Sequence, residues 1–198
     1  MTEILAALPG RSGEEAVRAA EGMVAGGFVV GIDLLAGPGP ALVSGLARLG
    51  PVLVLAGLHG DPADVAAAAR RFAEYGARWV SVQAIDGAGS VAAVAEAGVT
   101  AVAVTLRRGQ TDAEVASLRL GQSRGRTVSR LAEVAFAAGA GGILCDPRDL
   151  GVVAQVAPGV DRFVGVSSPR EATDAATRGA EFLIVESGRV PQVRAVLG

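Results

Sequence analysis

The single histidine of the chain, His59, is the side chain best suited to acid–base chemistry, because an unperturbed imidazole titrates near neutral pH. It ends an apolar run in the stretch VLVLAGLHGDPADV (52–65), and Asp61 follows two residues later. We predict that His59 is the acid–base group and that the Asp61 carboxylate orients it. A structural alternative stays open, because Asp61 followed by Pro62 also fits a helix N-cap, and a lone histidine beside a helix start is often a surface residue.

Polar residues at the ends of other apolar runs are candidates for binding an anionic substrate. Arginine suits this task because its guanidinium donates two parallel hydrogen bonds to one anion. Arg189 follows the last apolar run, where barrel phosphate sites commonly form, although it could instead pair with a surface acid. The predicted substrate- or anion-binding residues are Asp33, Gln83, Thr105, Arg107, Arg108, Ser167, Gly188 and Arg189.

The sequence contains no lysine, since all 18 residues in its lysine-plus-arginine count are arginines. Schiff-base catalysis needs a lysine amine, and arginine keeps its proton because its pKa exceeds about 12. Lysine-dependent mechanisms are therefore excluded for this sequence. The one cysteine, Cys145, cannot form an internal disulfide and is interpreted as a small core residue. A zinc site would need carboxylates beside one histidine and one cysteine, so we expect no metal and no cofactor.

Short apolar runs alternate with alanine-rich segments of helical character along the whole chain. Apolar runs without polar alternation indicate strands buried on both faces, as in a parallel sheet, and eight strand–helix units close into a barrel. An open doubly wound sheet is the alternative, but no Gly-x-Gly-x-x-Gly opens a helix after the first run. We therefore predict one α/β domain over residues 1–198, a (β/α)8 TIM barrel with its active site at the carboxyl ends of the strands. The runs are EILAAL (3–8), FVVGIDL (28–34), PVLVLAGL (51–58), RWVSVQAI (78–85), TAVAVTL (100–106), GGILC (141–145), RFVGV (162–166) and EFLIV (181–185).

Composition narrows the classes of partner. The 198 residues are 51% hydrophobic and carry a net charge of −2, so the chain is globular rather than disordered. No apolar run reaches the roughly 18 residues of a membrane span, and the start MTEILAAL lacks the features of a signal peptide. The arginines are scattered among acids, so nucleic acid is not expected as a partner. Because the chain has one cysteine, we expect it to be cytoplasmic. The expected partner is a small anionic molecule, bound by the arginines named above.

Several segments resemble orotidine 5'-monophosphate decarboxylases, and the resemblance extends over almost the whole chain. The segment from FVVGIDLL to AIDG (28–87) resembles the second to fourth strands of that family. VAVTLRRG (102–109) stands where the family has Val-Thr-x-Leu-Thr-Ser, and RLAEVAFAAGAGGILCDPRDL (130–150) resembles its sixth unit. The segment SSPREATDAATRGAEFLIVESGRV (167–190) resembles the last unit with its Gly-Arg. The resemblance implies the same barrel and a homodimer with the two mouths near the interface.

The catalytic motifs of that family are not matched. The family uses a lysine and an Asp-x-Lys-x-x-Asp array, whose lysine protonates the carbon from which carbon dioxide leaves. In this sequence the resemblance places the array on Leu55, Gly57 and Gly60, and the separate lysine on Val29. The first-strand aspartate falls near Pro9 and the fourth-strand histidine on Gln83, while Gly188 and Arg189 remain from the phosphate-binding residues.

Three hypotheses follow. The first is a barrel repurposed for a different small anionic metabolite, acting as a metal-independent lyase through His59 and Asp61. The second is a catalytically silent binding or scaffold protein. The third is an orotidylate decarboxylase with a rebuilt site. A repurposed enzyme predicts a polar mouth where His59 meets an arginine, whereas a silent protein predicts a mouth filled by apolar side chains such as Val29, Leu55 and Leu106.

Overall fold

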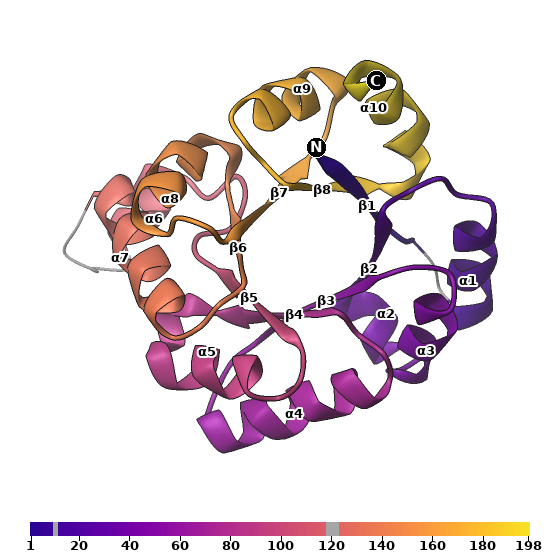
Figure 1. Ribbon diagram of the computed structural model, residues 1–198, viewed down its shortest axis with the longest axis horizontal. Coiled ribbons are helices and arrows are strands. Elements are labelled where there is room, and N and C mark those ends of the chain that lie inside the picture. Colours follow the sequence, from indigo (N-terminus) through magenta and orange to yellow (C-terminus); the bar gives the residue numbers. More distant parts are fainter. Residues whose placement is uncertain (10–11, 118–122) are drawn as a thin grey trace.

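The computed structural model describes residues 1–9, 12–117 and 123–198. Across these ranges, eight parallel strands pair in sequence order, and the last strand pairs with the first, so the sheet closes into a barrel (Figure 1). This confirms the predicted TIM barrel, and each predicted apolar run overlaps one strand. The strands are β1 (Glu3–Ala7), β2 (Gly27–Gly31), β3 (Val52–Leu58), β4 (Trp79–Gln83), β5 (Thr100–Val104), β6 (Gly142–Cys145), β7 (Asp161–Val166) and β8 (Phe182–Glu186).

Helices surround the barrel and follow the strands in alternation (Figure 1). Short 3-10 turns η1 (Ala84–Asp86), η2 (Pro147–Asp149) and η3 (Ser187–Arg189) follow three of the strands. None of the helices in the described part of the chain is long and apolar enough to cross a membrane. The α-helices are α1 (Gly13–Glu21), α2 (Ile32–Ala36), α3 (Ala41–Ala47), α4 (Pro62–Glu74), α5 (Ala88–Ala95), α6 (Asp112–Ser117), α7 (Arg124–Ala137), α8 (Leu150–Val156), α9 (Pro169–Thr177) and α10 (Val190–Leu197).

Side-chain caps fix where several helices begin. The Ser12 hydroxyl accepts a hydrogen bond from the Glu15 amide at the start of α1. The Asp61 carboxylate accepts one from the Ala63 amide, with Pro62 in the first turn of α4. Such caps satisfy amide groups that have no partner within the helix. The strand ends and helix starts that frame the barrel mouth are therefore encoded locally.

The barrel interior is filled by large side chains rather than by solvent. Trp79, Phe163 and Phe182 form its largest group, and Phe163 stacks on Phe182 with ring centroids 4.6 Å apart. Leu55 and Leu144 pack on this cluster from the side of the strand ends. Layers of inward-pointing side chains are the usual core of such barrels. Within the barrel itself, the space open to a ligand therefore lies at the mouth, above an apolar floor.

Candidate active site at the barrel mouth

A cavity of about 340 Å³ opens at the carboxyl ends of the strands. Its walls are largely apolar, and its polar side chains are Gln83, Arg107 and Arg108. A charged group placed against such walls would lose hydration, which is costly unless the protein supplies partners. The cavity is lined by Ile32, Leu55, Ala56, Gly57, Gln83, Val104, Leu106, Arg107, Arg108, Leu144, Cys145, Gly165 and Ile184.

Gly57 marks an irregularity in β3 at the edge of this cavity. Its φ is +58°, a left-handed conformation that favours glycine, and the β3–β4 register shifts between Val54 and Leu58. The Gly57 amide donates a hydrogen bond of 2.7 Å to the Ser81 hydroxyl. A Cβ atom at this position would lie 2.7 Å from Gln83 Nε2. A side chain at position 57 would therefore strain the backbone and displace Gln83.

His59 stands beside this mouth rather than in it. Its ring is 73% exposed, and Nδ1 lies 2.5 Å from Asp86 Oδ1. The other oxygen of Asp86 accepts a hydrogen bond from the Gly60 amide, so the nearly buried carboxylate is held on both sides. Among the described residues that line the cavity, neither His59 nor Asp61 occurs. The structure thus pairs His59 with Asp86, uses Asp61 as a cap, and leaves the catalytic roles of both as predictions.

Arg108 carries the most extensive set of contacts at the mouth. Its Nη2 donates hydrogen bonds to the Ser167 hydroxyl and to both carboxylate oxygens of Glu171, at 2.7–2.9 Å. The Ser167 amide and hydroxyl also donate to Glu171. Burial by itself raises the pKa of Glu171, but the bonds from Arg108 and Ser167 lower it below its ordinary value overall. Two of the predicted anion-binding residues are therefore engaged with an internal carboxylate.

The other predicted binding residues are distributed around the mouth. Gln83 and Arg107 line the cavity, whereas Thr105 is buried and donates its hydroxyl to the Leu144 carbonyl. Arg189 donates to the Ser167 carbonyl and pairs with Glu186 at 3.2 Å, so it adopts the surface-pair alternative. In the part of the chain that the structure describes, Asp33, Gly188 and Arg189 do not line this cavity.

A buried ion-pair network holds the loop that carries Arg107 and Arg108. Arg124 pairs with Asp149 at 2.7 Å and donates to the Gln110 carbonyl at 2.6 Å. Asp146 accepts hydrogen bonds from the amides of Gly109 and Arg148. Burial alone raises the pKa of Asp146, but these bonds lower it overall. Sequence analysis missed the network, although the alternation of acid and arginine in Asp146-Pro147-Arg148-Asp149 was a signal for it.

Cys145 ends β6 and lines the cavity, but it stays a thiol. Burial, followed by the negative charges of Asp149 and Asp146, raises its pKa to about 12. A thiolate nucleophile is therefore scarce at neutral pH. Within the described ranges, no group of three or more His, Cys, Asp or Glu side chains is placed to hold a metal ion.

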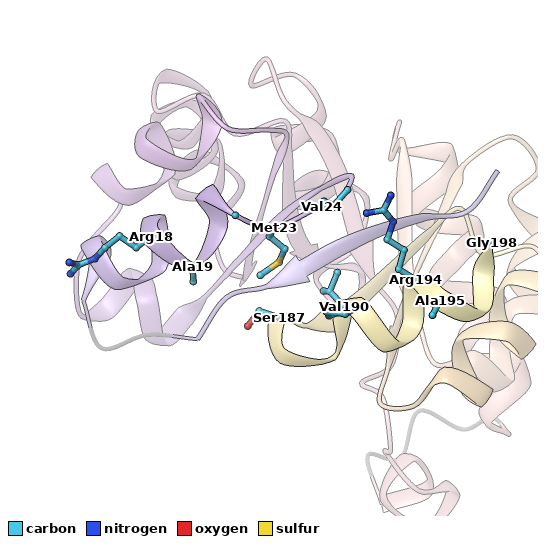
Figure 2. Close-up of a pocket in the computed structure, with 11 residues that line it drawn as sticks. Arg18, Ala19, Met23, Val24, Ser187, Val190, Arg194, Ala195 and Gly198 are labelled. Atoms are coloured by element: carbon cyan, nitrogen blue, oxygen red, sulfur yellow. The ribbon is translucent and has the colours of Figure 1, made fainter.

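A larger cavity, of about 720 Å³, lies outside the barrel between α1 and α10. Met23, Val24 and Val190 contribute apolar surface to it, and Figure 2 shows the Arg18 side chain extending away from the other labelled residues. Active sites of these barrels form at the carboxyl ends of the strands. The smaller cavity at the mouth is therefore the candidate active site.

Comparison with known proteins finds orotidine 5'-phosphate decarboxylases among the relatives by sequence. No family model matches the chain. It is 42% identical over 135 residues to the protein of that name from Anaeromyxobacter dehalogenans, which covers 66% of this chain and 60% of the relative. It is 37% identical over 131 residues to the one from Alkalilimnicola ehrlichii, covering 63% of this chain and 56% of that relative. The chain therefore matches these relatives over about 60% of their length.

Solved structures support the same barrel. The orotidine 5'-phosphate decarboxylase from Lactobacillus acidophilus superposes with a TM-score of 0.87 at 17% identity, covering 100% of this chain and 98% of that one. The one from Pyrococcus horikoshii OT3 gives 0.82 at 21% identity, covering 98% of this chain and 96% of the other. Names and folds together support similarity to the orotidine 5'-phosphate decarboxylase-like superfamily.

These relatives overturn the leading functional hypothesis. The interpretation as a barrel repurposed for a different anionic metabolite is wrong, because relatives up to 42% identical carry the name of the decarboxylase itself. The hypothesis rested on the absence of lysine and of the acidic array. The assignment of the array to Leu55, Gly57 and Gly60 comes from the resemblance alone and stays a prediction.

Proposed function

We propose that this chain is an orotidine 5'-phosphate decarboxylase whose site works without lysine. The observation that carries the proposal is the 42% identity to a protein of that name over 135 residues. The mouth cavity supports it, since about 340 Å³ lies within the roughly 300–1,000 Å³ typical of small-molecule sites.

The side chains of the cavity suit the two ends of this substrate. Arg107 and Arg108 stand at the rim, where guanidinium groups bind a phosphate with paired hydrogen bonds. The Gln83 amide carries both a donor and an acceptor, which match the amide groups of a pyrimidine ring. Leu144 and Ile184 form apolar surface beneath them. The pyrimidine carboxylate would then lie against apolar walls.

The proposed chemistry is the loss of carbon dioxide from that carboxylate. The bond between the ring carbon and the carboxylate breaks, neutral carbon dioxide leaves, and the electron pair stays on the ring carbon. Apolar walls disfavour the charged carboxylate relative to neutral carbon dioxide, provided that the phosphate contacts supply the binding energy. Because the sequence has no lysine, the carbanion takes its proton from water, which leaves hydroxide.

A second candidate is a barrel that binds the nucleotide without turning it over. The observation that favours it is Gly57, where the resemblance places a catalytic lysine but the chain has no side chain and a left-handed φ of +58°. Removal of an ammonium group from the reacting centre removes a source of transition-state stabilisation, and each tenfold loss in rate corresponds to about 1.4 kcal/mol.

The test is release of carbon dioxide from orotidine 5'-phosphate by chain purified from a host that lacks its own decarboxylase. We expect slow turnover, at or below roughly 1 per second, the low end of ordinary kcat values. Arg108→Ala is expected to raise KM at least about tenfold through loss of a charged phosphate contact. Arg170→Ala, an exposed arginine on α9, is the matched control and leaves KM unchanged.

Calorimetric titration with the same nucleotide separates the two candidates. Binding without release of carbon dioxide would favour the silent barrel, whereas neither binding nor release would reject both. The homodimer implied by the resemblance and the cytoplasmic location also belong to the proposal. Light scattering coupled to gel filtration tests the dimer directly.

A further inference from the structure

The Glu171 carboxylate lies in the first turn of α9 and is held by donors from Arg108 and Ser167. Arg108 Nη2 donates to Oε1 at 2.8 Å and to Oε2 at 2.7 Å. The Ser167 amide donates to Oε2 at 2.8 Å, and its hydroxyl donates to the same oxygen at 2.9 Å. Four donor contacts from a guanidinium, an amide and a hydroxyl are the set that a phosphate oxygen cluster would use.

The position of this pair connects it to the mouth. Arg108 lines the mouth cavity and also a neighbouring cavity of about 660 Å³, which Glu171 lines as well. Gly165 allows this placement, because a Cβ atom there would lie 3.3 Å from Arg108 Cδ. The Arg108 side chain is 44% exposed and that of Glu171 is 26% exposed, so solvent reaches both. A soluble anion therefore has access to the same donors.

We propose that Glu171 is an internal competitor for the phosphate site, so that a phosphate monoester binds at Arg108 and Ser167 only by displacing the Glu171 carboxylate. This inference rests on the proposed function, because it takes Arg108 as a phosphate-binding residue. A carboxylate carries one negative charge, whereas a phosphate monoester carries nearly two at neutral pH. The competition selects for dianionic phosphates over carboxylate ligands, which gain no charge advantage over Glu171.

The experiment compares the binding of inorganic phosphate and of uridine 5'-monophosphate to the whole chain and to Glu171→Gln, by calorimetry at fixed ionic strength. Glu171→Gln removes the competing charge at nearly constant side-chain volume. We expect both ligands to bind about tenfold more tightly to the variant, since charge-assisted bonds to Arg108 become free. In the double variant Glu171→Gln/Arg108→Ala this gain is expected to disappear.

Glu181→Gln provides the matched control. Glu181 also accepts from an arginine side chain and from a backbone amide, both of Arg162, but at the other end of the barrel. Its variant is expected to bind both ligands as the unaltered chain does. A folded Glu171→Gln protein, shown by an unchanged circular dichroism spectrum, that binds neither ligand more tightly would overturn the inference.

The outcome is separable from the fate of the proposed function. A gain in phosphate affinity in Glu171→Gln without any release of carbon dioxide supports the competitor and rejects the decarboxylase. Release of carbon dioxide by the unaltered chain, with no gain in phosphate affinity in Glu171→Gln, supports the decarboxylase and rejects the competitor.

Discussion

The Gln83 amide nitrogen lies where the Cβ atom of any residue other than glycine at position 57 would point, with 2.7 Å between them. Position 57 also has a φ of +58°. The left-handed backbone disfavours any other residue at this position, and a side chain there would also push the end of the Gln83 side chain aside; both features belong to the irregular end of β3.

Gly57→Ala is accordingly expected to lower the free energy of unfolding by about 1–3 kcal/mol, from left-handed strain and the contact with Gln83. Urea unfolding measures it. Gly151→Ala in α8 is the control, because a Cβ there meets nothing within 4 Å and its φ is ordinary. That substitution should be neutral or slightly stabilising. If the two substitutions changed the free energy of unfolding equally, the claim that position 57 specifically requires glycine would be contradicted.

His59→Ala is expected to leave kcat/KM for carbon dioxide release within about twofold of the unaltered chain. The ring is 73% exposed and contacts Asp86 rather than the cavity. Steady-state rates of release near pH 7 measure the effect. A loss of tenfold or more, about 1.4 kcal/mol, would return the imidazole to the mechanism.

Arg124→Met is expected to destabilise the chain by about 3 kcal/mol or more, because it leaves the buried Asp149 carboxylate without its partner. The Arg124 and Asp149 side chains are 9% and 5% exposed. Arg130→Met in the same helix is the control, since Arg130 is 75% exposed and pairs loosely with Glu133 at 3.7 Å. The control should cost less than about 1 kcal/mol. Chemical unfolding measures both variants. Similar unfolding midpoints for Arg124→Met and Arg130→Met would contradict the stabilising role of the Arg124–Asp149 pair.

The unfolding free energy is expected to fall as the pH drops below the ordinary carboxyl range. Asp146 and Glu171 have pKa values below their ordinary 3.8 and 4.5 in the folded chain. A carboxyl group whose pKa is lower in the folded chain than in the unfolded chain stabilises the fold at any pH above its pKa in the unfolded chain. This contribution is lost as the pH falls through the pKa of the group in the folded chain. Urea titrations from pH 6 down to pH 3 measure the slope. Asp146→Asn should flatten it, and an unchanged slope in this variant would count against the role of Asp146.

The fold was predictable because its determinants are local. The apolar runs mark strands buried on both faces, and caps such as Ser12 and Asp61 mark helix starts, all within a few residues in sequence. Three of the predicted binding residues line the cavity for the same reason, since Gln83 is the last residue of β4 and Arg107 and Arg108 follow the end of β5.

The ion-pair partners of the side chains at the mouth, such as those of Arg108 and His59, could not be predicted from the sequence. Glu171 lies 63 residues from Arg108, and Asp86 lies 27 residues from His59, so each contact depends on how distant elements pack. Nearness in sequence predicts Asp61 as the partner of His59, whereas the structure engages the Asp61 carboxylate in the cap of α4. The functional hypothesis gave most weight to residues the chain lacks, and overall similarity to named decarboxylases outweighs that argument.

The aromatic filling of the barrel has an optical consequence. The chain has one tryptophan, Trp79, and it sits edge-on to Phe163 and Phe182 beneath the apolar floor, with the Arg78 guanidinium 4.6 Å from its ring centroid. Its fluorescence will therefore register loss of the folded state sharply, yet stay nearly silent when a nucleotide fills the mouth above it. Trp79 fluorescence is therefore suited to following unfolding of the barrel. Binding of a nucleotide has to be followed by calorimetry or by measuring product.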